Sequence, residues 1–336
     1  MTVADMPTIF WDNGQNKPYN PLDFNFDQFW GTVTLRNALQ NSLNIPAVKV
    51  MQFAGVDDVR AMAMRMGITN WSGTWGLSSV LGTLDVHPYE MVQAYSVFAN
   101  YGQFFPLFAI NKITDSSGDT LFQHTEPQGV QVMSPLVAFL VTSVLSDNFT
   151  RAKDFGACSP LFLDSSRSDC IAYLRQRPPG NPTGQVTWPS PNAWPSAAKT
   201  GTGNDFQDDW TLGYTMDYVG GFWGGNNDHT SMIRIDGITG AAPVWKSAML
   251  YAERNLPKTP FPIPPKGLSK ITYKSNGISS TDWIITSVKP PKDIGNVAPD
   301  QLPCILFTND PKDPWKYSAG DCQGKLIPGG NSPYRP

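Results

Sequence analysis

The chain has 336 residues, of which 40% are hydrophobic and 16% charged, and its formal net charge is −3. This composition is typical of a globular protein and excludes a disordered one. The weak negative charge gives no electrostatic reason to expect a nucleic-acid partner, and no apolar run reaches the length of a membrane span.

Periodic apolar residues predict a series of helices after a polar, irregular lead-in at residues 1–30. A proline at the first helical position and a glycine past the last mark several of their ends. The predicted helices begin near Thr34 and Pro46, run from Asp57 to Gly67 and from Pro88 to Gly102, begin again at Ser134-Pro135, and run from Val244 to Leu256. A hairpin is expected between Leu107 and Phe122, and a long proline-rich surface loop at residues 152–195.

Two short motifs carry the candidate chemistry. Ser42-Leu43-Asn44 falls at the elbow between two predicted helices, where a hydroxyl and an amide can both project into a cleft. Lys199-Thr200-Gly201-Thr202 begins an antiparallel meander that continues through Trp210–Tyr214 and Tyr218–Trp223. Either motif alone has an ordinary structural explanation, a helix C-terminal hydroxyl for the first and a strand end for the second.

Seen together and in order, these landmarks resemble the transpeptidase domain of class A (bifunctional) penicillin-binding proteins. The resemblance rests on Gly31 to Val48, on Leu81-Gly82, on Pro88 to Gly102, on Lys199 to Thr202 with Asp209-Trp210 and Gly213-Tyr214, on Trp223-Gly224, and on Gly240 to Trp245. It covers the chain from about Asp5 to Leu256, with the stretch near 160–195 as a departure.

The resemblance implies an α/β (α+β) serine β-lactamase/transpeptidase-like fold, with an antiparallel sheet packed against helices and a helical lobe. It implies a partial transpeptidase domain at residues 1–256. A Pro-rich linker and a β-rich or disordered C-terminal appendage are expected at 257–336. The implied function is peptidoglycan D,D-transpeptidation through a serine acyl-enzyme, with D-Ala-D-Ala stem peptides and β-lactams as ligands.

Each motif residue receives a role from this resemblance. Ser42 would relay a proton, and Asn44 would hold the base lysine and the amide of the substrate. Lys199 would supply positive potential, while the hydroxyls of Thr200 and Thr202 would bind the terminal carboxylate. The backbone N–H of Thr202, after Gly201, would be one oxyanion donor.

One family motif is not found where the family has it. Ser-x-x-Lys should precede Ser42, but residues 1–40 contain no such tetrapeptide. Ser196-Ala197-Ala198-Lys199 fits the letters, but in an extended strand its two side chains point to opposite faces. We therefore expect a chain that begins inside the domain and lacks the nucleophile, a glycosyltransferase domain and a membrane anchor, all belonging to a longer parent protein.

Two other functions remain open at this point. A non-catalytic remnant or cell-wall binding protein would keep the site but form no acyl-enzyme. A β-lactamase-like hydrolase is less favoured, since no deacylating glutamate is recognisable. We expect no cofactor and no metal, because His87, His124 and His229 lie far apart and Asp205, Asp208 and Asp209 lack calcium-loop spacing.

The four cysteines form two local pairs, Cys158 with Cys170 and Cys304 with Cys322. Their spacing leaves both two disulfides and four free thiols open. Because the family works outside the membrane, the resemblance favours the two disulfides. It also places the parent protein at the extracytoplasmic face of the bacterial plasma membrane, although Met1–Asn20 has no signal-peptide pattern.

Overall fold

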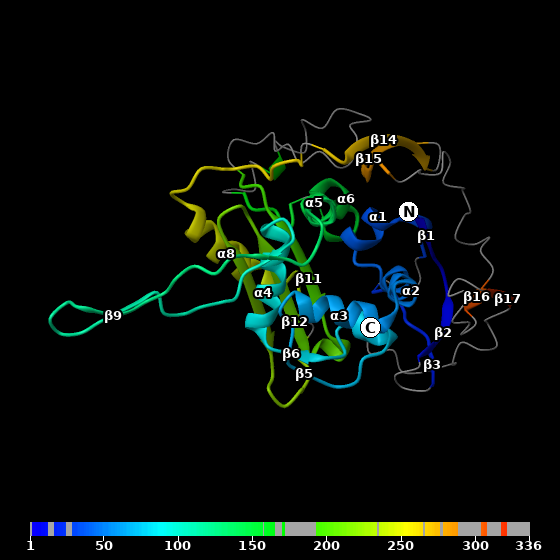
Figure 1. Cartoon of the computed structure of the whole chain (residues 1–336). Helices are drawn as coiled ribbons and strands as arrows, with labels where there is room; N and C mark the ends of the chain where they lie inside the picture. The colour runs from blue at the N-terminus through cyan, green and yellow to red at the C-terminus, as the bar shows by residue number, and fades with distance from the viewer. Residues whose placement is uncertain are drawn as a thin grey trace.

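The computed structural model contains a three-stranded antiparallel sheet covered on both faces by helices, with a helical lobe beside it (Figure 1). The structure describes residues 2–12, 17–24, 29–156, 158–164, 170–171, 193–233, 235–264, 266–275, 278–287, 304–307 and 317–320.

The central sheet is formed by β11 (Ala197–Thr202), β12 (Asp208–Tyr214) and β13 (Val219–Gly225), in that order. Both pairings are antiparallel, so the predicted meander is confirmed. Lys199 pairs with Leu212, which places the lysine in the middle of the edge strand β11.

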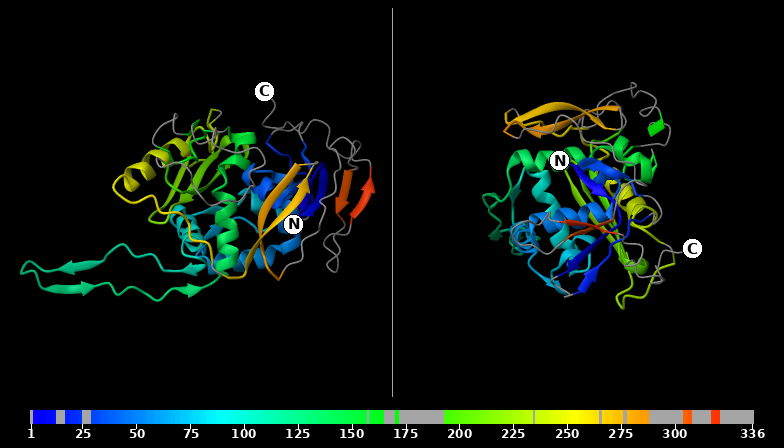
Figure 2. Two further views of the ribbon diagram at one scale, coloured as in Figure 1. Left: turned by 90° about the horizontal axis from the view of Figure 1, so that it is seen from above. Right: turned by 90° about the vertical axis from the view of Figure 1, so that its right-hand side faces the viewer.

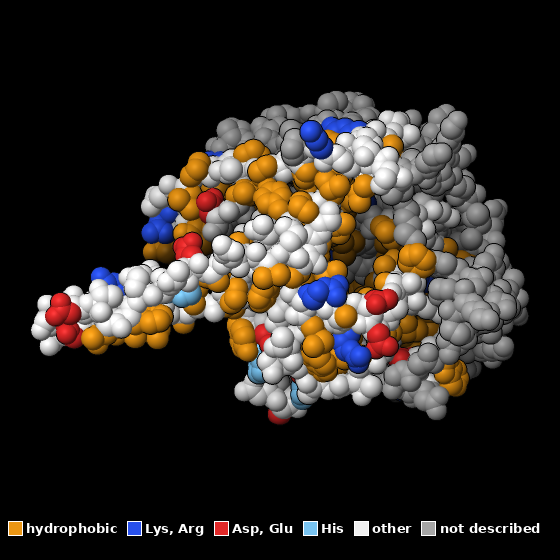
Figure 3. Space-filling view, viewed as in Figure 1, with side chains coloured by type: hydrophobic (Ala, Val, Ile, Leu, Met, Phe, Trp, Pro, Cys, Tyr) orange, Lys and Arg blue, Asp and Glu red, His pale blue; other side chains and the backbone are white. Residues whose placement is uncertain are grey.

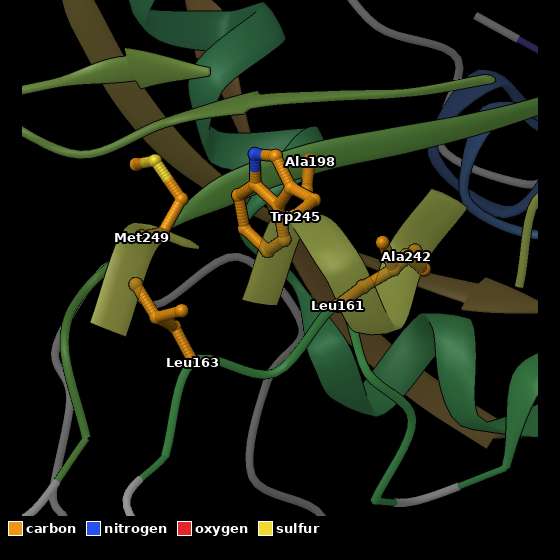
Figure 4. Close-up of a cluster of buried hydrophobic side chains, with 6 residues drawn as sticks. All are labelled: Leu161, Leu163, Ala198, Ala242, Trp245 and Met249. Carbon is orange, nitrogen blue, oxygen red and sulfur yellow. The ribbon is translucent and has the colours of Figure 1, made fainter. Parts of the chain in front are cut away.

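Helices cover the two faces of this sheet. On one face α4 (Pro88–Ala99) and α5 (Pro135–Leu145) pack through Tyr95 and Phe139 against Ala197 and Tyr214. On the other face α8 (Ala241–Glu253) packs through Trp245 and Met249 against Ala198 (Figure 4). Since Ala197 and Ala198 are neighbours on one strand, the two cores lie on opposite sides of the sheet.

The helical lobe contains α1 (Leu35–Gln40), α2 (Asn44–Ala54), α3 (Val56–Arg65), the 3₁₀ helix η1 (Leu77–Leu81) and α6 (Asn148–Phe155). Thr34 begins α1 as its N-cap, because its hydroxyl accepts a hydrogen bond from the N–H of Asn37.

The segment before this lobe is not irregular as expected. It forms β1 (Thr2–Asp5), which pairs with β4 (Gly31–Thr34), and β2 (Thr8–Asp12), which pairs with β3 (Lys17–Tyr19). Val3 and Phe10 are buried, so these short strands are held by tertiary packing that the polar composition of the segment hides.

A hairpin of β8 (Lys112–Thr114) and β9 (Thr120–Gln123) projects far from the body of the molecule (Figure 2). Apolar side chains gather along one side of this arm (Figure 3). The exposed apolar residues of its two strands include Ile113 and Phe122, which are paired across the hairpin, and Leu121. The described chain also contains two pairs of two-residue strands, β5 (Trp71–Ser72) with β6 (Asp85–Val86) and β7 (Gln103–Phe104) with β10 (Val130–Gln131).

After Leu256 the described chain forms two β-hairpins, β14 (Leu268–Ser275) with β15 (Ile278–Ile285), and β16 (Cys304–Phe307) with β17 (Tyr317–Gly320). The first hairpin packs on the helices, with the Trp283 ring 5.7 Å from that of Phe139. The backbone of β16 pairs with β2 in parallel. The division into two units at Leu256 stays a prediction, although these contacts join the C-terminal segment closely to the preceding one.

The structure joins Cys158 to Cys170 by a disulfide, with the two Cα atoms 5.7 Å apart. The other expected pairing involves Cys322, which lies outside the described residues, as does most of the proline-rich stretch before residue 193. Within the described chain, no helix combines the length and hydrophobicity required to cross a bilayer. The described residues also contain no group of three or more His, Cys, Asp or Glu placed to hold a metal ion.

We predict that Trp245→Ala lowers the free energy of unfolding by about 3–5 kcal/mol, because the indole is fully buried against β11 and its removal leaves a cavity. Val244→Ala is the matched control, since Val244 is the preceding residue of α8 and is 52% exposed. Urea denaturation followed by fluorescence measures both. Equal losses in the two variants would contradict this account of the core.

Candidate functional site

The turn that carries Ser42 is tightly constrained. Ser42 has a φ of 56°, in the left-handed region that non-glycine residues seldom occupy. The turn is closed by two backbone hydrogen bonds, from Ser42 N–H to Leu39 O and from Leu43 N–H to Ala38 O. It therefore fixes the direction in which the Ser42 side chain leaves the helix pair.

The N-terminus of helix α2, which begins with Asn44, is capped by a residue from another segment of the chain. Its N-cap residue Leu43 has no side chain that can accept a hydrogen bond. Asp23 fills this role, because its Oδ1 accepts from the N–H groups of Asn44 and Ile45. The favourable interaction of a carboxylate with the positive end of the helix adds to the effect.

Lys199 approaches Ser42 from the sheet. Its Nζ lies 2.7 Å from Ser42 Oγ and 2.8 Å from the carbonyl oxygen of Thr200. The two motif residues are separated by 157 positions in the chain, so only the tertiary fold brings them together.

The Lys199 amine is poorly solvated. Burial, and in second place the nearby positive charge of Arg151, together lower its pKa from 10.5 to about 7. The ring of Phe155 lies 6.0 Å from Nζ. Near neutral pH the amine is therefore poised between its neutral and charged forms, and it can exchange a proton with the Ser42 hydroxyl.

The side chains of Thr200 and Thr202 lie beside the loop at Gly237. Thr202 Oγ1 accepts from Gly237 N–H at 3.1 Å, which leaves the hydroxyl proton of Thr202 available for another acceptor. A Cβ at Gly237 would come within 2.7 Å of Thr200 Cβ, so only glycine fits there. At Gly201, by contrast, a Cβ would meet Trp210 Cβ at an ordinary 3.5 Å, so contacts within the protein do not require that glycine.

The structure shows no hydrogen bond between the side chains of Asn44 and Lys199, both of which it describes. The Asn44 amide nitrogen donates to the carbonyl oxygen of Leu22 at 2.7 Å. Its expected role in holding the base lysine and the substrate amide stays a prediction. Ser42 and Lys199 are thus the two sequence-predicted residues whose side chains the structure joins directly.

A second titratable cluster lies behind the Ser42 turn. Burial raises the pKa of Asp5 to about 8, and the neighbouring carboxyl of Asp23 adds to this rise. Burial also lowers the pKa of Lys49 to about 8, with opposing contributions from Asp5 and Asp23. Lys49 Nζ donates to Ala4 O at 2.6 Å, which ties α2 to β1.

Sequence reasoning missed Asp23 and Arg151. Arg151 is almost fully buried in α6, and its guanidinium bonds Gln40 Oε1 at 3.0 Å and Ala198 O at 2.8 Å. A single arginine in a segment that is polar in sequence does not indicate that its side chain is buried and bonded to distant segments. An aspartate two residues after Pro21 likewise reads as an ordinary loop residue, because the helix it caps starts 21 positions later.

The sequence model of the family described as "Penicillin binding protein transpeptidase domain" matches residues 8–226 of the chain. The chain belongs to this family. The class A resemblance agrees with curated relatives such as penicillin-binding protein 1A of Aquifex aeolicus, 28% identical over 268 residues, or 80% of this chain and 32% of the relative. Penicillin-binding protein 4 of Bacillus subtilis is 27% identical over 240 residues, or 70% of this chain and 33% of the relative. The chain thus spans about a third of the length of these relatives.

Solved structures show the same transpeptidase fold. Penicillin-binding protein 1A from Haemophilus influenzae has a TM-score of 0.66 at 22% identity, and the match covers 87% of this chain and 45% of that one. PonA1 from Mycobacterium tuberculosis has a TM-score of 0.55 at 22% identity, over 74% of this chain and 63% of that one, and has also been solved with penicillin V. The expected fold, a β-lactamase/transpeptidase-like sheet with helices and a helical lobe, is confirmed.

The pKa of Lys199 predicts how stability changes with pH in this penicillin-binding domain. Because its folded value of about 7 lies below the ordinary lysine value of 10.5, the folded chain binds fewer protons than the unfolded chain between these pH values. The contribution of Lys199 to the free energy of unfolding therefore rises with pH across this window, by about 1.4 kcal/mol per pH unit at most.

Lys199→Met removes this titration. We predict that any stability advantage of the variant over the wild type shrinks as the pH rises from 7 to 10. Parallel urea titrations at four pH values measure the difference, and the comparison cancels the contribution of Lys49 and other groups. A difference that stays constant over this range would show that Lys199 titrates normally.

Proposed function

We propose that the Ser42–Lys199 site binds the D-alanyl-D-alanine end of peptidoglycan stem peptides, as part of a D,D-transpeptidase that works through a serine acyl-enzyme. The observation that carries this proposal is the 2.7 Å hydrogen bond between Lys199 Nζ and Ser42 Oγ, beside the 2.8 Å bond from Nζ to the Thr200 carbonyl. Family membership supports the reaction class, and this geometry supports the assignment of Lys199 to the ligand site.

In this proposal, the terminal carboxylate of the stem peptide lies against β11. An incoming carboxylate favours the charged form of Lys199, so it strengthens the tendency of the amine to take up a proton through Ser42. Thr202 contributes the hydroxyl proton that its bond from Gly237 leaves available. The ligand backbone can approach Gly201 closely, because glycine has no Cβ. This approach explains a glycine at a position where contacts within the protein do not require one.

Ser42 then acts as a proton relay. Its hydroxyl touches the Lys199 amine, whose pKa of about 7 suits it to accept and return a proton near neutral pH. The backbone N–H of Thr202 would donate to the oxyanion formed when the carbonyl is attacked.

The attacking serine is not assigned within these 336 residues. Ser196 precedes β11, is buried, and its hydroxyl has no hydrogen-bond partner among the described residues. Lys199 is bonded to Ser42 and Thr200 instead. We propose that the nucleophile belongs to a Ser-x-x-Lys of a longer parent, which also carries a glycosyltransferase domain and a membrane anchor. The Cys158–Cys170 disulfide supports an extracytoplasmic location.

The binding half of the proposal predicts that diacetyl-L-lysyl-D-alanyl-D-alanine binds this chain and that Lys199→Met weakens binding about 10- to 100-fold. Loss of a charge-assisted hydrogen bond to a carboxylate costs about 1.5–3 kcal/mol. Isothermal titration calorimetry measures the affinity. The L-alanyl-L-alanine peptide is the ligand control, and Lys112→Met on the exposed arm is the protein control. Equal affinity of wild type and Lys199→Met would refute the assignment.

The catalytic half predicts that this chain alone gains no mass on incubation with benzylpenicillin, because no hydrogen bond joins a serine hydroxyl to a lysine other than Lys199 in the part of the chain that the structure describes. Intact-mass spectrometry measures this directly. A stoichiometric adduct that hydroxylamine removes would contradict the prediction. Peptide mapping would then identify the acylated serine. If the peptide binds but no parent sequence supplies a nucleophile, the chain is a cell-wall binding protein.

A further inference from the structure

One buried guanidinium contacts the chain beside both members of the Ser42–Lys199 pair. Arg151, in α6, donates from Nε to Gln40 Oε1, two residues before Ser42. From one terminal nitrogen it donates to the carbonyl of Ala198, the residue before Lys199. The guanidinium therefore spans the gap between α1 and β11 at the level of the site.

The remaining donors of Arg151 hold it in place. Its other terminal nitrogen donates to Asn148 Oδ1 at 2.9 Å, and the carbonyl of Leu145 accepts a further bond. Only 2% of the Arg151 surface is exposed. A planar fork with five N–H groups can satisfy acceptors on several elements at once, which a lysine ammonium cannot do in the same geometry.

The charge of Arg151 also acts on the site. Two causes lower the pKa of Lys199, burial first and the positive charge of Arg151 second. The groups that face Lys199 are Ser42 from the turn after α1, Arg151 and Phe155 from α6, and the Thr200 carbonyl of its own strand.

Acidic groups lie farther away in this network. Asp147 faces Arg151 and raises the pKa of the guanidinium, which burial lowers to about 10. None of the other nearby charged groups is among the causes that shift the pKa of Lys199; they are Asp5, Asp23, Lys49, Lys153 and Asp154.

We propose that Arg151 is a positioning residue for the Ser42–Lys199 site, which fixes the two side chains by binding the chain beside each and keeps the Lys199 amine able to accept the Ser42 proton. The relevance of this to catalysis rests on the proposed function, but the effect on Lys199 is a property of the chain itself. Arg151 acts through Lys199 and needs no contact with substrate.

The test is an NMR titration of the Lys199 side chain in the full 336-residue chain with ¹³C,¹⁵N-labelled lysine, the Lys199 signal being assigned by its loss in Lys199→Met. We expect Arg151→Met to raise the Lys199 midpoint by about one pH unit, because it removes a buried like charge. Arg151→Lys keeps the charge, and we expect its midpoint to stay near that of the wild type.

Arg36→Met is the matched control. Arg36 is equally buried, lies on α1, and bonds the Ser143 carbonyl of α5 and the carboxylate of Asp282. It is not among the causes that shift Lys199. Its loss should destabilise the fold in a comparable way and leave the Lys199 midpoint unchanged.

A Lys199 midpoint that moves no more in Arg151→Met than in Arg36→Met would overturn the proposal. If Arg151→Met does not fold, Arg151→Lys decides, because a midpoint displaced upward although the charge is kept would equally overturn it. Calorimetry with the D-Ala-D-Ala peptide separates the two proposals. Failure of wild-type binding refutes the proposed function, while the Lys199 titration tests Arg151 independently.

Discussion

Two buried arginines tie α1, the helix that precedes the Ser42 turn, to distant parts of the chain. Arg151 connects α1 and α6 to β11, and Arg36 connects α1 to α5 and to the β14–β15 hairpin. Each guanidinium is removed from water and therefore needs hydrogen-bond acceptors, and every nitrogen of both groups has at least one. The acceptors are backbone carbonyls and side-chain oxygens on α1, α5, α6, β11 and β15, which leaves little freedom in how the elements are arranged.

The positions of the elements could largely be predicted from local signals. Pro88 and Ser134-Pro135 marked the starts of α4 and α5, and the Lys199 meander formed as the alternating pattern indicated. The buried faces were harder to predict. On α5, Val137 shares the apolar periodicity of the helix but is 38% exposed, whereas the polar Thr142 and Ser143 are buried. Thr142 bonds the Tyr214 hydroxyl and Ser143 bonds Arg36, so polar partners distant in sequence overturn the apolar periodicity.

The distance in sequence between bonded partners also explains which site residues could be predicted and which could not. Ser42 and Lys199 stand in short motifs, and their meeting follows from the family pattern. Arg151 and Asp23 act through hydrogen bonds to segments far along the chain, and no spacing rule relates them to these partners. Asn44 was assigned by the motif alone, and the structure gives its amide a different acceptor in Leu22.

The long sequence separation of these bonds has a consequence for the order of folding. Ser42 and Lys199 are 157 residues apart, and the ion pair of Arg36 with Asp282 joins residues 246 positions apart. Contacts between such distant segments form slowly, because the entropy of closing each loop is lost before the contact stabilises it. The helix pair at Ser42 and the β11–β13 meander are local and can form early, whereas the site requires both. The acid–base property of Lys199 is therefore acquired only when the chain has closed over it, and a chain with native secondary structure but incomplete long-range contacts has an ordinary lysine there.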